Sequence, residues 1–219
     1  MKVPAVADPA RFERALARFD AANGEDPNRE TVDGHERAKE LVYAERMTAM
    51  LARFAPEASE TLRLAARGQH IQRWKMPRSD YPMDRIGYLQ WRKRANQFHA
   101  RVAAEILREA GYDDATVARV SALLKKEALK SDAEAQTLED VVDLVFLESY
   151  LANFAAAHRD YATDKFIDIL RKTAKKMSSR GRSAAISLIS VPAALAPVVT
   201  SAMTTAANVE SEDVGAAPA

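Results

Sequence analysis

The chain has 219 residues, of which 47% are hydrophobic, and its 32 lysines and arginines nearly balance its 31 aspartates and glutamates. That length and composition suit one domain with a sizeable core. Because the sequence has no cysteine, disulfides, thiolate-bound zinc, iron–sulfur clusters and cysteine nucleophiles are excluded. The N-terminus carries charges throughout and no continuous apolar stretch, which is unlike a secretory signal, so we expect a cytoplasmic protein.

Helical periodicity dominates the sequence, and prolines and glycines mark where the helices begin and end. Residues 75–84 hold two prolines and no periodicity, which predicts an irregular basic connection. Gly111 is expected to end one helix, and Asp113 or Asp114 to cap the next. We expect an all-α bundle of about seven helices, at approximately residues 9–24, 34–54, 56–74, 85–110, 113–130, 131–158 and 163–181.

The C-terminal part differs in composition from the rest. We expect one helical domain over residues 8–189 and an Ala-rich tail over 190–219 that has no core-forming pattern and is disordered. Residues 184–207 are apolar, but Pro192, Pro197 and several Ser and Thr make them a poor membrane helix. No membrane partner is therefore expected.

Charge is segregated along the chain. Residues 63–101 contain ten lysines or arginines and two aspartates, whereas residues 127–148 contain seven acidic residues and one lysine. The two segments could pair with each other, or the basic one could form a wall for an anionic ligand. In the second interpretation Arg73, Lys75, Arg78 and Arg85 would bind the phosphate or carboxylate groups of a substrate.

Three histidines lie on the apolar stripes of the expected helices, which predicts that their rings point inward. Each of His35, His70 and His99 could be a core histidine bound to a backbone carbonyl. Together with a carboxylate, three neutral imidazoles inside a helical bundle would instead form a metal site.

Carboxylates that could complete such a site come from two places in the sequence. Asp140 shares a stripe with Leu144, Leu147 and Leu151 and should point into the core. A buried carboxylate needs a cation, a metal or several donors, and the alternative to a metal is an arginine such as Arg67 or Arg73. Glu36 and Glu139 are the candidates for a general base.

The order of these residues resembles the metal-binding arrangement of the HD-domain superfamily, in which His, His-Asp and Asp ligate a metal. Here Ile71 follows His70, where that superfamily has the Asp. The resemblance implies an HD-like bundle and a divalent ion such as Mn, Fe, Mg or Zn. The ion would be held by His35, His70 and Asp140, with His99 or Glu36 in the remaining position.

A longer resemblance, over about residues 8–189, rests on four stretches: DGHERAKELVYAERMTAML (33–51), AARGQHIQRWKMPRSDYPMDRIGYLQWRKRANQFHA (65–100), LEDVVDLVFLE (138–148) and ILRKTAKKMSSRG (169–181). They resemble the domain of unknown function 4202 family, found in bacteria and fungi. That name implies no activity.

The leading functional hypothesis is a metal-dependent hydrolase acting on a phosphorylated small molecule or nucleotide. A second hypothesis is a non-catalytic helical module that binds RNA or an acidic partner through the basic segment, with the histidines merely packed. A third, implied by the HD-domain resemblance, is a non-heme iron oxygenase.

Overall fold

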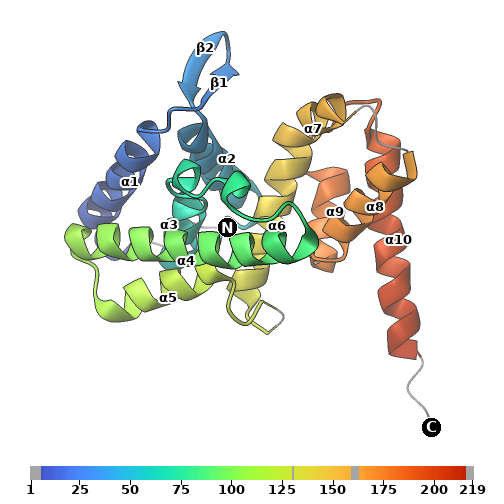
Figure 1. The fold of residues 1–219 in the computed structure, drawn as a ribbon. Helices are drawn as coiled ribbons and strands as arrows, with labels where there is room; N and C mark the ends of the chain where they lie inside the picture. The colour runs from blue at the N-terminus through green and yellow to red at the C-terminus, as the bar shows by residue number, and fades with distance from the viewer. Residues whose placement is uncertain (1–5, 130, 159–162, 216–219) are drawn as a thin grey trace. The chain divides into compact units, whose positions relative to one another are not determined.

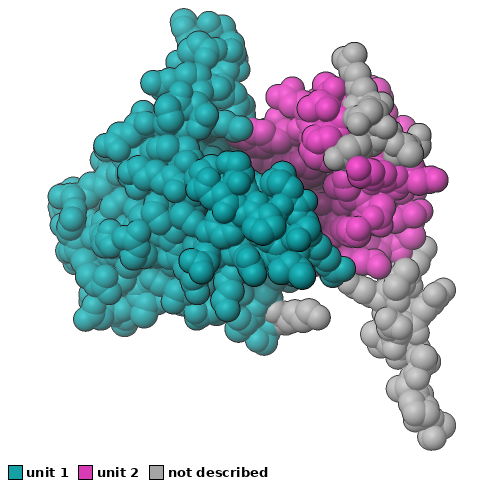
Figure 2. Space-filling view, in the orientation of Figure 1, with its two compact units in different colours: residues 1–138 teal, residues 139–219 magenta. Residues whose placement is uncertain are grey.

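The structure, a computed structural model, describes residues 6–129, 131–158 and 163–215. The described residues are mostly helical with one two-stranded sheet, which confirms the expected mostly-α class. The chain forms two compact units, residues 1–138 and 139–219 (Figure 2), where the sequence predicted one domain over 8–189. The boundary falls inside a helix, so no linker in the sequence marks it.

The first unit is built from helices that pack on one another in pairs. Its elements are α1 (Pro9–Gly24), β1 (Arg29–Val32), β2 (His35–Ala38), α2 (Lys39–Phe54), α3 (Glu60–Gly68), the 3₁₀ turns η1 (Arg73–Lys75) and η2 (Arg78–Asp80), α4 (Arg85–Ala110), α5 (Asp114–Lys125) and the start of α6 (Ala133–Val145). α4 and α5 form a helical hairpin, α5 also packs on α3, and α1 packs on both α2 and α4 (Figure 1). Phe19, Met47, Leu64 and Leu107 are buried between these helices.

The expected helix over 34–54 is wrong at its N-terminal end, because residues 29–38 form a β-hairpin. The two strands are antiparallel with Val32 opposite His35. Asp33 and Gly34, the two loop residues, have φ of 51° and 79°, as a tight hairpin turn with two left-handed residues requires. The Asp-Gly pair was therefore the sequence signal for this hairpin.

The expected helix over 56–74 is shorter than predicted. α3 begins after Ser59, whose hydroxyl accepts a hydrogen bond from Leu62 N, and it ends at Gly68. His70 and Gln72 then adopt left-handed backbone conformations, with φ of 63° and 51°. Such conformations are costly for residues other than glycine. They turn the chain sharply, so His70 lies in a loop rather than on a helix.

α4 matches its prediction, and both of its ends are capped. At the N-terminus the Asp84 carboxylate accepts a hydrogen bond from Gly87 N at 2.7 Å. At the C-terminus Gly111 has a φ of 93°, and Asp113 then caps α5 through Thr116 N. α5 ends at Lys125 rather than near residue 130. The expected irregular connection over 75–84 is present apart from the short turns η1 and η2.

The second unit contains the rest of α6, a π-helical turn (Phe146–Tyr150), α7 (Leu151–Ala157), α8 (Thr163–Ala174), α9 (Ser179–Ser187) and α10 (Ala196–Gly215). The helix expected over 131–158 is thus present from Ala133 to Ala157, with the π-helical turn inside it. α9 was not foreseen as a separate helix. No helix in the described part of the chain is both long and apolar enough to cross a membrane.

The sequence predicted a disordered tail over 190–219, whereas the structure has α10 (Ala196–Gly215) in this part of the chain. Val199, Ala202, Met203 and Ala206 are buried, and their spacing of three or four residues places them on one helical face. α10 packs on α8 and α9. Two of the four buried residues are alanines, so the buried face of α10 lacks the large apolar side chains from which a core helix is predicted.

Gly87 allows the loop before α4 to pack against the first turn of that helix. A Cβ at Gly87 would lie 2.1 Å from the Pro82 carbonyl oxygen. Gly87→Ala should therefore lower the free energy of unfolding by roughly 1–3 kcal/mol, because backbone has to move. Gly24→Ala is the matched control, since a Cβ there meets nothing within 4 Å. Urea unfolding of both variants would test this, and equal stability would contradict the close approach.

Candidate functional site

Two histidine rings lie together inside the first unit. The ring centroids of His70, in the loop after α3, and His99, in the middle of α4, are 5.7 Å apart and tilted by 47°. Tyr43 on α2 stacks on His70, with centroids 4.5 Å apart and an interplanar angle of 17°. Residues from α2, this loop and α4 thus form a single cluster. We call His70 and His99 the histidine pair, and Tyr43 packs against it.

The tautomer of His99 is set by the backbone. Its Nδ1 lies 2.7 Å from the Ile71 carbonyl oxygen, and a carbonyl can only accept, so Nδ1 donates the hydrogen bond. In the neutral ring Nε2 then carries a lone pair. This atom is buried and has no hydrogen-bond partner among the described residues. A histidine whose other nitrogen donates to a carbonyl, leaving an open lone pair, has the arrangement of a metal ligand.

Both rings are neutral near pH 7. Burial lowers the pKa of His99 to about 4, against the raising effect of its bond to Ile71. Burial, then the charge of Arg73 and the neighbouring His99, holds the pKa of His70 well below its usual value. The pair is therefore available as nitrogen ligands without first losing protons.

Arg73 is the cation whose charge acts on both histidines of this site. Its guanidinium lies over the Trp91 ring, 4.7 Å from the centroid, and Trp91 is held in turn by a 2.8 Å hydrogen bond from Nε1 to the Met76 carbonyl. The charge of Arg73 lowers the pKa of His70, His99 and Glu40. One arginine therefore influences the protonation of all three groups.

Glu40 is a buried acid that the sequence analysis missed. It is 8% exposed, and burial raises its pKa to about 7, with Arg73 opposing the shift. Its backbone N donates to the Asp26 carboxylate at 3.0 Å, which fixes the first turn of α2. Glu40 shares an i, i+3, i+7 stripe with Tyr43 and Met47, and that stripe becomes visible once the helix is known to begin at Lys39.

Other polar groups are buried along the loop after α3. Asn23 Oδ1 accepts a hydrogen bond from Gln72 N at 3.0 Å. Asn23 Nδ2 and Gln69 Oε1 are buried without hydrogen-bond partners among the described residues. Open buried polar atoms are costly in a core, and their concentration here is typical of a functional site.

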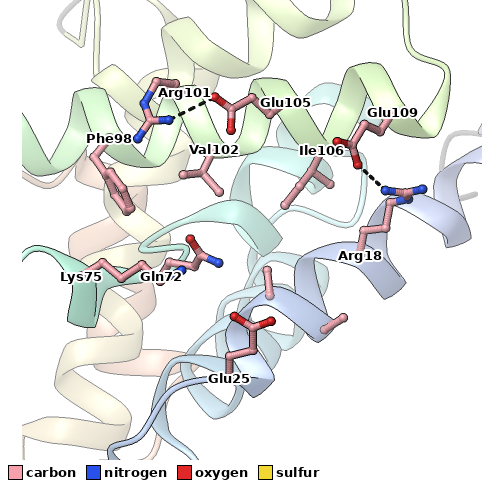
Figure 3. Close-up of a pocket in the computed structure, with 12 residues that line it drawn as sticks. Arg18, Glu25, Gln72, Lys75, Phe98, Arg101, Val102, Glu105, Ile106 and Glu109 are labelled. Atoms are coloured by element: carbon pink, nitrogen blue, oxygen red, sulfur yellow. Dashed lines mark hydrogen bonds and ion pairs between the residues drawn. The ribbon is translucent and has the colours of Figure 1, made fainter.

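A groove of about 550 Å³ runs between α1 and α4 (Figure 3). Phe98, Val102 and Ile106 supply apolar surface, and Arg101 forms an ion pair with Glu105 at 3.1 Å. The remaining lining residues are Arg18, Ala21, Ala22, Glu25, Gln72, Lys75 and Glu109, of which Arg18 and Glu109 form an ion pair. The Phe98 ring packs edge-on against His99 at 5.7 Å, so the groove and the histidine pair share α4 and the loop after α3.

The predicted metal ligands are not all brought together. His35 is exposed on β2, so the prediction of an inward ring there is wrong, because its chain segment is a strand. His70 and His99 are adjacent. Asp140 belongs to the second unit, where it accepts hydrogen bonds from Ser178 N at 2.8 Å and Ser178 Oγ at 2.5 Å. Among the described residues, no group of three or more histidines and carboxylates that could hold a metal ion is found.

Asp140 has a clear role in the second unit. It sits at the start of α9, where a Cβ at Gly181 would lie 2.6 Å from its Cγ. The carboxylate thus accepts hydrogen bonds from Ser178, the residue that caps α9. Its negative charge interacts favourably with the positive end of the α9 dipole. Arg67, one of the two arginines expected as an alternative partner, binds both oxygens of Asp20 in the first unit at 2.6 Å.

The two predicted general bases, Glu36 and Glu139, lie in different environments. Glu36 is exposed on β2 and accepts a hydrogen bond from the Thr31 hydroxyl. Glu139 is 1% exposed in the second unit, with Lys176 Nζ 3.5 Å away and the same amine 2.8 Å from Asp143. Glu36 thus lies at the surface of the first unit and Glu139 in the interior of the second.

The four predicted substrate-binding cations differ in their environments. Arg73 is half-buried beside the histidine pair, and Lys75 is exposed at the groove. Arg78 stabilises the loop before α4, because its guanidinium donates hydrogen bonds to the carbonyls of Tyr81, Pro82 and Asp84. Arg85 is exposed at the start of α4.

The comparisons with known proteins point to a family without a described activity. A family model described as Domain of unknown function (DUF4202) matches residues 13–199. Neither a curated protein nor a solved structure matches the chain. The match confirms the DUF4202 resemblance found in the sequence, and the HD-domain resemblance stays a prediction.

The raised pKa of Glu40 predicts a pH-dependent effect of Glu40→Gln. Stability contributed by a carboxyl with a raised pKa is complete below its ordinary value of 4.5 and is lost as pH rises through about 7. At pH 8 the variant should therefore be more stable than wild type by up to about 3 kcal/mol, relative to their difference at pH 4.5. Urea unfolding at pH 8, 6 and 4.5 measures this. The exposed Glu36→Gln is the control, and a difference that is constant with pH would contradict the burial of Glu40.

Proposed function

We propose that this chain, which belongs to the DUF4202 family, is a metal-dependent hydrolase that acts on a phosphorylated small molecule or nucleotide. The observation that carries the proposal is the lone pair of His99 Nε2, buried without a hydrogen-bond partner among the described residues, beside the neutral ring of His70. Burying an imidazole acceptor without a partner is unfavourable. A bound metal ion would accept the lone pair of His99 Nε2 and so remove this penalty.

The residues that would hold the ion are His70 and His99. Neutral imidazoles suit zinc and iron, and the bond from His99 Nδ1 to Ile71 keeps Nε2 deprotonated for this purpose. The ion, when bound, lowers the pKa of a coordinated water and polarises a phosphoryl oxygen. Two nitrogens are fewer ligands than a catalytic ion needs from a protein, so further ligands would come from other groups.

Glu40 is the residue that we assign to accept a proton, in place of Glu36 and Glu139. A general base works best when its pKa lies near the working pH, and burial brings the pKa of Glu40 to about 7. The charge of Arg73 acts on both Glu40 and the histidine pair, which supports a common site. Ionisation of the buried Glu40 lowers the free energy of unfolding, which is expected of a residue with a catalytic role rather than a packing role.

Anionic groups of the substrate would be neutralised by Arg73 and Lys75. Arg73 is oriented by its stacking on Trp91, so its guanidinium is preorganised for a phosphoryl group. Lys75 stands at the groove and forms no ion pair with a described residue; its amine lies 5.8 Å from the centroid of the Trp74 ring. The apolar surface of Phe98, Val102 and Ile106 would receive the organic part of the substrate.

Metal content tests the histidine pair directly. Protein purified without a histidine tag and reconstituted with Mn, Fe or Zn should carry about one ion per chain by elemental analysis. His99→Asn and His70→Ala should each weaken metal binding by more than about tenfold. His35→Ala should leave it unchanged, because His35 is exposed on the β-hairpin.

One result would contradict this metal site, and another would contradict hydrolysis as its reaction. One is equal metal content in wild type, His70→Ala and His99→Asn, with circular dichroism showing that all three are folded. The other is iron that turns over oxygen without releasing phosphate, which would favour an oxygenase over a hydrolase.

Phosphate release tests the catalytic assignment. Wild type with its metal should release phosphate from at least one compound in a panel of nucleotides and sugar phosphates. Glu40→Gln should lower kcat by about 100-fold or more, because it removes the proton acceptor but keeps the shape. The exposed Glu36→Gln should retain activity. Equal kcat for wild type and Glu40→Gln would exclude Glu40 as the base.

A further inference from the structure

The start of α4 carries an unusual group of exposed apolar side chains. Met83, Ile86 and Leu89 are 80%, 67% and 54% exposed, and Tyr88 is 43% exposed. Among the described residues, only Ile186, in the second unit, is another large hydrophobic side chain with comparable exposure. We call Met83, Ile86 and Leu89 the aliphatic ridge. Exposed apolar groups that cluster in this way mark interaction sites.

The ridge is held in place rather than frayed. The Arg78 guanidinium donates to the carbonyls of Tyr81 at 3.0 Å, Pro82 at 2.7 Å and Asp84 at 3.2 Å. Pro82 lies against Gly87, and the Asp84 carboxylate caps α4 at Gly87 N. The loop and the first turn of the helix therefore present Met83 and Ile86 in a fixed arrangement, which lowers the entropic cost of binding.

Cations surround the ridge without being neutralised. Lys93 is seven residues after Ile86, about two helical turns, so it extends the ridge along α4. Arg85 precedes Ile86 and Arg94 follows Lys93 by one residue, which places them on opposite sides of the ridge. All three cations are exposed, and none forms an ion pair with another described residue of the chain.

We propose that the aliphatic ridge is a docking surface for a protein partner, and that the partner offers an apolar groove edged by acidic side chains. The ridge would enter the groove, and Arg85, Lys93 and Arg94 would face the acidic edge. A second copy of this chain is disfavoured, because it would bring like charges together. Single-stranded RNA is disfavoured because aliphatic side chains give bases no stacking surface.

This surface is independent of the proposed hydrolase. Its residues point to solvent from α4 and the loop before it, whereas His99 and Trp91 lie on the buried side of the same helix. Loss of partner binding would therefore leave metal binding unchanged. Failure of either proposal would not decide the other.

Photo-crosslinking from the ridge is the first step of the test. Leu89→p-benzoylphenylalanine in the full chain, expressed in its own cells, should cross-link to one protein. Mass spectrometry should map the cross-link to an apolar groove with neighbouring Asp or Glu. The same substitution at Ile186, 49% exposed, is the control and should not give that product. Cross-links to RNA, to lipid or to a second copy, or no cross-link at all, would overturn the proposal.

Charge reversal then tests the acidic edge. In a binding measurement between the full chain and the identified protein, Ile86→Ser and Lys93→Glu should each weaken affinity by at least about tenfold. Reversing an acidic residue of the mapped segment should restore binding to Lys93→Glu but not to Ile86→Ser. Gln97→Glu, on the same exposed face farther along α4, is the control and should have little effect. Unchanged affinity for Ile86→Ser or Lys93→Glu, or no restoration, would overturn the assigned chemistry.

Discussion

The hydrogen bond from His99 Nδ1 to the Ile71 carbonyl is the interaction on which the first unit's candidate site depends. It joins the middle of α4 to a loop in which His70 and Gln72, on either side of Ile71, are both left-handed. That loop conformation costs free energy, and the bond from Gln72 N to Asn23 Oδ1 helps to offset it. The same arrangement turns the His70 ring between Tyr43 and His99 and fixes which nitrogen of His99 is left open. Backbone geometry, rather than the sequence stripe, thus builds the histidine pair.

Electrostatics around the pair are unfavourable for folding but suited to chemistry. Burial keeps both imidazoles neutral and raises the pKa of Glu40, while Arg73 supplies the compensating positive charge. A structural core would replace such groups by apolar ones of similar size. A buried acid with a raised pKa and two neutral imidazoles, all influenced by Arg73, distinguish this region from ordinary packing.

The second unit uses its buried carboxylates differently. Asp140 accepts from the backbone and hydroxyl of Ser178, and Lys176 lies close to both Glu139 and Asp143. These contacts connect α6 to the segment between α8 and α9. In this unit the acidic residues therefore have donors of their own, and Gly181 allows α9 to begin directly against Asp140. Three residues of the acidic stretch, Glu139, Asp140 and Asp143, thus join α6 to the segment between α8 and α9.

Periodicity and capping residues by themselves determined the mostly-α class, the bounds of α4 and the inward direction of His99, because these depend on neighbours three or four residues apart. The DUF4202 assignment also came from the sequence alone. His35 is exposed because a two-residue Asp-Gly turn, a local signal in the sequence, outweighed the helical pattern after it. Only the tertiary structure decided that His70 faces His99 from a loop and that Arg78 donates hydrogen bonds to backbone carbonyls. The pKa of Glu40 is likewise raised by burial and opposed by Arg73, which lies far from it in the sequence, so no local pattern could reveal the shift.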